Sequence, residues 1–209
     1  MKYTTTAGRR PLAMIAACAS ALGLAAAAAF SIGASSAGAA VASSDEQSFT
    51  FKLKPSAGIT ACLPHAGGKV TITPGRQNDK MQVSIHGMPH GAEFDLFVIE
   101  QPTKPFGVSW YQTDVDADQH GNGTATVRGI FDKETFTVSP DPAKTIAPTH
   151  QFHLGLWFNS PRLPFNLGCE AGAPNPIVTP FNGEQHAGIQ VLNTAQFPVN
   201  AGPLGHVHR

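Results

Sequence analysis

Apolar and polar residues alternate along several stretches of this chain, and this alternation restricts the chain to folds built from strands. Residues 49–54, 70–73, 81–86 and 150–159 place apolar side chains at every second position. A period of two is the pattern of a strand with one buried face. Residues 94–99 form an apolar run, which predicts a central strand covered on both faces.

Turn-forming residues separate these stretches, and no long stretch has the period of a helix. The chain contains 17 Pro and 21 Gly, which interrupt helices. We therefore predict an all-β fold, a single antiparallel β-sandwich of the immunoglobulin-like kind. Two long Pro-rich loops are expected at residues 139–149 and 160–180.

The first 42 residues have the pattern of a secretory signal peptide, which leaves residues 43–209 as one domain. Lys2, Arg9 and Arg10 precede a long Ala-rich and Leu-rich run, and small residues near position 40 offer cleavage sites. Three alternatives stay open. The run could be retained as an anchor, Cys18 could lie in a lipoprotein signal, and the arginine pair could belong to a twin-arginine signal.

Cleavage changes both the charge and the cysteine content. The three basic residues of the leader are lost while all 14 acidic residues remain, so the mature chain is mildly acidic. It has no basic field for nucleic acid or anionic lipid, and no stable membrane span. Only Cys62 and Cys169 are left, and a pair of cysteines in an exported protein predicts one disulfide.

Histidines give a first candidate for a metal site. His86 and His90 flank Met88 in a turn, and these side chains together could form a soft, copper-like ligand set. No spacing matches a strong zinc motif, so we favour solvated histidines and expect no cofactor.

An acidic run at Asp114, Asp116 and Asp118 begins like a calcium loop. However, Gln119 stands where such a loop has its glycine, and Ala125 stands where it has its last acid. We therefore predict a hairpin turn that leads into the next strand.

Signals for catalysis are weak. Glu184 and His186 are the best candidates for a general acid and base in a hydrolase, but no spacing singles them out. The sequence therefore favours a protein without enzymatic activity.

Two aromatic clusters are the strongest binding signal. Trp110 and Tyr111 lie in one of them, and Trp157 lies near Asn159 in the other. On the alternation of residues 150–159, Trp157 and Asn159 share the face away from the core. A large ring beside an amide suits stacking on a sugar or on a partner side chain. The competing interpretation is that a loop or a second sheet covers Trp157.

Several segments resemble a set of exported bacterial proteins, seen largely in actinobacteria, that have no known activity. The segments are PFGVSWYQ at residues 105–112, ETF at 134–136, HLGLWFNSP at 153–161, TPFNGE at 179–184 and AGIQVLNT at 187–194. The resemblance implies an exported, β-rich domain. The aromatic clusters favour a secreted or surface-associated binding module for an envelope glycan, polysaccharide or protein. An extracytoplasmic copper or zinc protein is the alternative, and a secreted hydrolase is the third.

Overall fold

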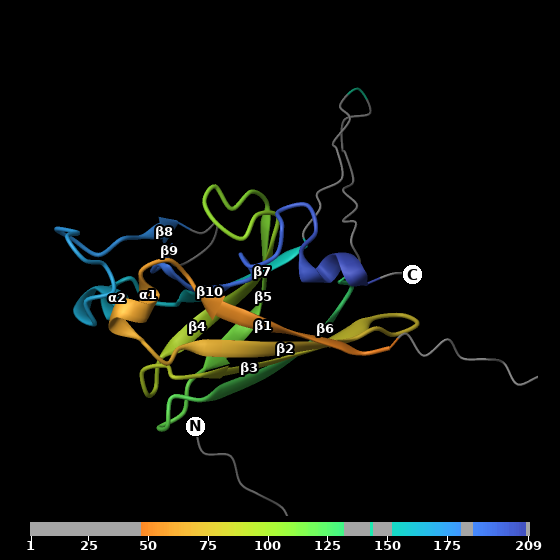
Figure 1. Cartoon of the computed structure of the whole chain (residues 1–209), viewed down its shortest axis with the longest axis horizontal. Coiled ribbons are helices and arrows are strands. Elements are labelled where there is room, and N and C mark those ends of the chain that lie inside the picture. The colour runs from red at the N-terminus through yellow and green to blue at the C-terminus, as the bar shows by residue number, and fades with distance from the viewer. Residues whose placement is uncertain (1–46, 132–142, 144–151, 181–185, 208–209) are drawn as a thin grey trace, which may run out of the picture. The chain divides into compact units, whose positions relative to one another are not determined.

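The computed structural model describes residues 47–131, 143, 152–180 and 186–207 of the 209-residue chain. These residues form strands with few and short helices (Figure 1). In chain order the elements are β1 (Phe49–Pro55), α1 (Ile59–Cys62), β2 (Gly67–Thr73), β3 (Asp79–His86), β4 (Glu93–Ile99), β5 (Ser109–Asp116), β6 (Gly123–Gly129), β7 (His153–Phe158), α2 (Arg162–Asn166), β8 (Thr179–Pro180), β9 (His186–Ala187), β10 (Gln190–Asn193) and the 3₁₀ helix η1 (Pro203–His206).

One antiparallel sheet contains eight of the strands, in the order β5-β4-β7-β10-β1-β2-β3-β6. The β1–β10 ladder is short and pairs Lys54 with Asn193 and Pro55 with Leu192. It joins the strands β5-β4-β7-β10 to the strands β1-β2-β3-β6. The prediction of an all-β antiparallel fold is confirmed, and the sheet is nearly barrel-like. Its division into an immunoglobulin-like sandwich stays a prediction.

The period-two stretches are strands, as predicted. β1, β2 and β3 bury alternate residues, and their buried side chains belong to the core. β4 is buried at every position after Glu93, which fits the prediction of a covered central strand. β7 is also buried at every position, so the expectation of an open face on this strand is wrong.

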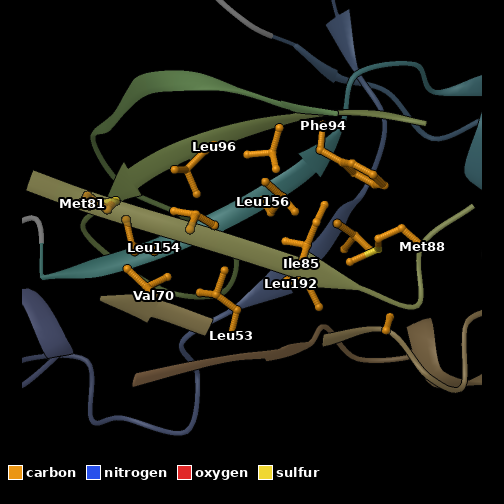
Figure 2. Close-up of a cluster of buried hydrophobic side chains, with 14 of the residues drawn as sticks. Leu53, Val70, Met81, Ile85, Met88, Phe94, Leu96, Leu154, Leu156 and Leu192 are labelled. Atoms are coloured by element: carbon orange, nitrogen blue, oxygen red, sulfur yellow. The ribbon is translucent and has the colours of Figure 1, made fainter. Parts of the chain in front are cut away.

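The main core lies on the face that β4, β7 and β10 share with β1, β2 and β3. Figure 2 shows Leu96, Leu154, Leu156 and Leu192 gathered with the apolar side chains of the neighbouring strands. Phe94 and Phe158 are fully buried there, with ring centroids 5.2 Å apart. Burying such side chains is the largest favourable contribution to folding.

A disulfide joins Cys62, at the end of α1, to Cys169, which follows α2. This is the predicted bridge, and it closes a sequence separation of 107 residues. It fastens the second Pro-rich segment to the sheet, and within that segment α2 forms where a loop was expected. Of the first Pro-rich segment, only Ala143 is among the described residues.

Candidate functional site

The outer face of β4 and β7, opposite the main core, holds a second and smaller cluster. Phe97, Ile99, Trp157 and Ala187 are buried in it, and Phe106 packs against them. The Trp157 ring makes edge-to-face contacts with Phe106, at 4.9 Å between centroids, and with Phe97, at 5.4 Å. Only 2% of Trp157 is exposed.

The competing interpretation, in which other parts of the chain cover Trp157, is therefore confirmed, and the choice of Trp157 as a contact residue is wrong. Phe106, from the loop between β4 and β5, and Ala187, from β9, cover the face that the alternation had left unassigned. Gly155 makes room for the ring, because a Cβ there would meet the Cζ3 atom of Trp157 at 2.4 Å and Nε2 of Gln190 at 2.7 Å. The buried indole supports the Phe97 and Phe106 rings that pack against it.

A row of polar side chains crosses this outer face from strand to strand. Asp114 of β5 pairs with Asp95 of β4, Asp95 pairs with Trp157 of β7, and Trp157 pairs with Gln190 of β10. Directly paired residues of neighbouring strands point to the same face of a sheet. Sequence positions far apart are thereby brought into one line, which we call the polar row.

Three atoms of the polar row are buried and have no hydrogen-bond partner among the described residues. They are Oδ2 of Asp95, Nε1 of Trp157 and Nε2 of Gln190. The Gln190 carbonyl oxygen, by contrast, accepts from Ser56 Oγ at 3.1 Å and from Asn193 Nδ2 at 3.0 Å. An unpaired buried polar group costs roughly 1–3 kcal/mol of stability, and more when it is charged. The row therefore carries a cost that the main core does not.

Asp95 is the most perturbed group in the row. Its pKa is raised to about 6, mainly by burial and also by the carboxylate of Asp114, by a side-chain hydrogen bond with Asp114 and by the carboxylate of Glu93. No Lys or Arg occurs in β4, β5 or β7 to oppose them. A carboxylate that is buried among other carboxylates resists ionisation, because its charge is neither hydrated nor paired.

The ladder explains why the two aspartates act on each other. The Ala117 N–H donates to the Ala92 carbonyl, which makes these residues a hydrogen-bonded pair. Pairs alternate along an antiparallel ladder, so Asp95 and Asp114, three steps further, form a non-hydrogen-bonded pair. The side chains of such pairs lie closer together than those of hydrogen-bonded pairs.

Tyr111 closes the outer end of the row. Its hydroxyl donates to Oδ1 of Asp114 at 2.8 Å, and its ring meets Phe97 edge to face at 5.8 Å. Burial raises the pKa of this phenol to about 12, with further contributions from Asp114 and Asp95. A register shift between Leu96 and Phe97 lets Tyr111 and Asp114 share a face although they are an odd number of residues apart.

Exposed aromatic surface gathers on β5, the end strand of the sheet. Trp110 and Tyr111 are each 53% exposed. Trp110 pairs with Val98, whose side chain joins the main core, so it stands on the opposite side of β5 from Tyr111. Asn159 is half-buried beyond the end of β7, where its backbone N–H donates to the Glu93 carbonyl. Of the predicted contact residues, Trp110 and Tyr111 are the most exposed.

Sequence reasoning missed Asp95. The apolar residues at 94–99 predict a strand that is covered on both faces, although Asp95 interrupts the run at its second position. A charged residue inside a strand that is otherwise fully apolar is the signal that could have found it, because such residues are rarely buried without a partner.

The proposed set of His86, Met88 and His90 does not come together as metal ligands. Met88 is 6% exposed and belongs to the main core (Figure 2), whereas His86 is exposed and its ring lies against Gly67. The alternative of a copper-like site on these three residues is therefore wrong, because the Met88 thioether is buried in the core. Within the described part of the chain, no three His, Cys, Asp or Glu side chains gather as ligands.

The acidic run ends in the predicted turn, which leads into β6, but no ladder of the described strands pairs β5 with β6 as a hairpin. Oδ1 of Asp118 accepts the backbone N–H groups of His120, at 2.8 Å, and Asn122, at 2.9 Å. These two hydrogen bonds lower the pKa of Asp118. The carboxylate that a calcium loop would use as a ligand instead holds the turn between β5 and β6.

His153 is a buried structural histidine. Its Nε2–H donates to the Val199 carbonyl at 3.0 Å, and its Nδ1 accepts from the Thr194 hydroxyl at 2.9 Å. Burial lowers its pKa. The hydrolase pair stays a prediction, since Glu184 lies outside the described residues and so does the side chain of His186.

Comparison of the chain with protein-family models and with curated proteins finds no match. The resemblance to exported bacterial proteins therefore stays a prediction. The disulfide is compatible with an extracytoplasmic protein. Among the described residues, no helix is long and apolar enough to cross a membrane.

Proposed function

We propose that this protein is an exported binding module without enzymatic activity, which holds an envelope glycan, polysaccharide or protein at the cell surface. The observation that carries the proposal is the exposure of Trp110 and Tyr111 on the end strand β5. Large aromatic rings dominate binding energetics, and they are costly to leave in water.

The surroundings of Tyr111 fix it in place. Its ring packs on Phe97, Phe97 packs on Trp157, and Phe106 covers Trp157 from the other side. A ring held by buried neighbours loses little conformational freedom on binding, which favours affinity. Trp157 thus contributes as a support beneath Tyr111 and makes no direct contact with the ligand.

Retention on envelope material tests the proposal. The mature protein is incubated with purified cell envelope, and the bound fraction of the wild type is compared with that of the double variant Trp110→Ala, Tyr111→Ala. We expect the double variant to lose most of its retention while its unfolding midpoint changes little, because both side chains are largely exposed.

Ile130→Ala is the matched control. Ile130 is 71% exposed directly after β6, and its loss removes exposed apolar surface without altering a residue of β5. Retention that is equal in wild type and double variant, or reduced equally by the control, contradicts the proposed contact residues.

A further inference from the structure

We propose that the outer edge of β5 binds an extended basic segment of another protein, which adds a strand to the sheet and places a Lys or Arg side chain against Asp114 and Asp95. The inference rests on the proposed function and names the class of partner.

The backbone of β5 offers an unused edge. Among the described residues β5 has a ladder with β4 alone, and its sequence contains no Pro, Lys or Arg, which commonly block such edges. β6 lies beside the Asp116 end of β5, where Gly123 packs against the Asp116 carbonyl, so the unused part of the edge is the Ser109 end. The Glu100 N–H donates to the Val108 carbonyl, so this pair is hydrogen-bonded. By alternation, the backbone groups of Ser109 point away from β4 and can pair with an added strand.

The charge beside this edge is negative and uncompensated. Asp114 and Asp116 of β5 face Asp95 and Glu93 of β4, and neither strand has a basic residue. Asp95 supplies an independent observation, because it is 2% exposed and its Oδ2 has no partner among the described residues. The Asp95 side chain otherwise shares a hydrogen bond with Asp114, which is itself an acid, so ionising both carboxyls costs stability, and a cation from a ligand would remove that cost.

An extended peptide fits this arrangement better than the other occupants. A second copy of the chain would bring the same carboxylates and no cation on β5, so its charges would repel. A neutral glycan would leave the charge of Asp95 and Asp114 unpaired. An extended peptide satisfies the backbone edge, and its alternate side chains lie over the Tyr111 face and the Trp110 face.

Peptide titration of the mature protein tests the proposal. The probe is an acetylated and amidated peptide of about ten residues that alternates lysine and threonine, a length that covers a typical strand. The matched probe replaces each lysine by glutamate. We expect the lysine peptide to bind and to protect the Ser109 amide from hydrogen exchange, and we expect the glutamate peptide not to bind.

Three variants separate the parts of the site. Asp114→Asn and Asp95→Asn should each raise the Kd of the lysine peptide about tenfold, a change of about 1.4 kcal/mol. Ser109→Pro removes an outward N–H at the start of the strand, where proline is tolerated, and should weaken binding similarly. Unfolding of each variant is measured alongside, and Asp95→Asn should be at least as stable as the wild type.

Failure of this inference is distinct from failure of the proposed function. Unchanged binding in Ser109→Pro would mean that attraction to the acids acts without strand addition, and unchanged binding in Asp95→Asn would remove the buried carboxylate from the site. Dimerisation of the protein alone through β5 would name a second copy as the occupant. Each result overturns the inference. If envelope retention still depends on Trp110 and Tyr111, the proposed function stands without it.

Discussion

The two faces of β4 and β7 are built from the same strands but differ in how completely their side chains are satisfied. The inner face carries Phe94, Leu96, Leu154, Leu156 and Phe158, all of them apolar and fully buried. The outer face carries Asp95, Trp157 and, from β10, Gln190, each with a buried polar atom that lacks a partner among the described residues.

This difference separates stability from binding. The inner face contributes burial with no polar cost, whereas the outer face buries aromatic rings and a carboxylate together. Native sheets pair their buried polar groups, and exceptions concentrate where a ligand or a functional state requires them. The inner face therefore contributes mainly to stability, whereas the outer face combines buried rings with buried polar atoms that lack partners among the described residues.

The largest effect is expected on the inner face. Phe94→Ala should cost about 3–5 kcal/mol of unfolding free energy, because it empties a closely packed site against Phe158. Chemical denaturation measures this, with Ile130→Ala as the exposed control. A loss below about 1 kcal/mol would contradict the assignment of this face as the stabilising core.

On the outer face, Trp157→Ala should cost roughly 3 kcal/mol, because the ring is buried between Phe97 and Phe106. Trp157→Phe should cost less than half as much, since it retains an aromatic ring and removes the unpaired Nε1–H. Denaturation of the two variants side by side tests this. Equal losses of unfolding free energy in the two variants would show that the unpaired Nε1–H does not destabilise the protein.

Asp95→Asn should act in the opposite direction and depend on pH. The pKa of Asp95 is about 6 in the folded protein against an ordinary value of 3.8, so its contribution to stability is full below pH 3.8 and is lost as the pH rises to about 6. The variant does not titrate. It should therefore exceed the wild type by on the order of 1–2 kcal/mol above pH 6 and match it at pH 4.

Unfolding curves at pH 4 and pH 8 measure this difference. Asp118→Asn is the control, because the pKa of Asp118 is lowered by its turn hydrogen bonds and its loss should destabilise the protein at pH 8. If the difference in unfolding free energy between Asp95→Asn and the wild type is the same at both pH values, the raised pKa of Asp95 is contradicted.

The smallest effect on stability is expected for the single variant Trp110→Ala. The ring is largely exposed, so the unfolding free energy should change by no more than about 0.5 kcal/mol. Envelope retention is expected to fall nevertheless. A large loss of stability would place the indole in the fold and remove it from the proposed contact surface.

Much of the fold could be predicted, and only part of the candidate site. Alternation in residues 49–54 and 81–86 indicated β1 and β3, and the expectation that Cys18 lies in a cleaved leader pointed to Cys62 and Cys169 as the pair that forms the disulfide. Trp110 and Tyr111 were chosen as exposed aromatics and are exposed. The place of Met88 in the core could not be predicted, because a thioether suits a metal site and an apolar core equally well.

The sequence by itself determined which residues of the regular strands share a face, because the period of two is a local property of extended backbone. Only the tertiary structure decided what covers each face. Phe106 and Ala187 bury Trp157 from other parts of the chain, and strand register places Asp95 between Asp114 and Trp157. Register and coverage depend on contacts between segments far apart in the sequence, and no pattern within one segment records them.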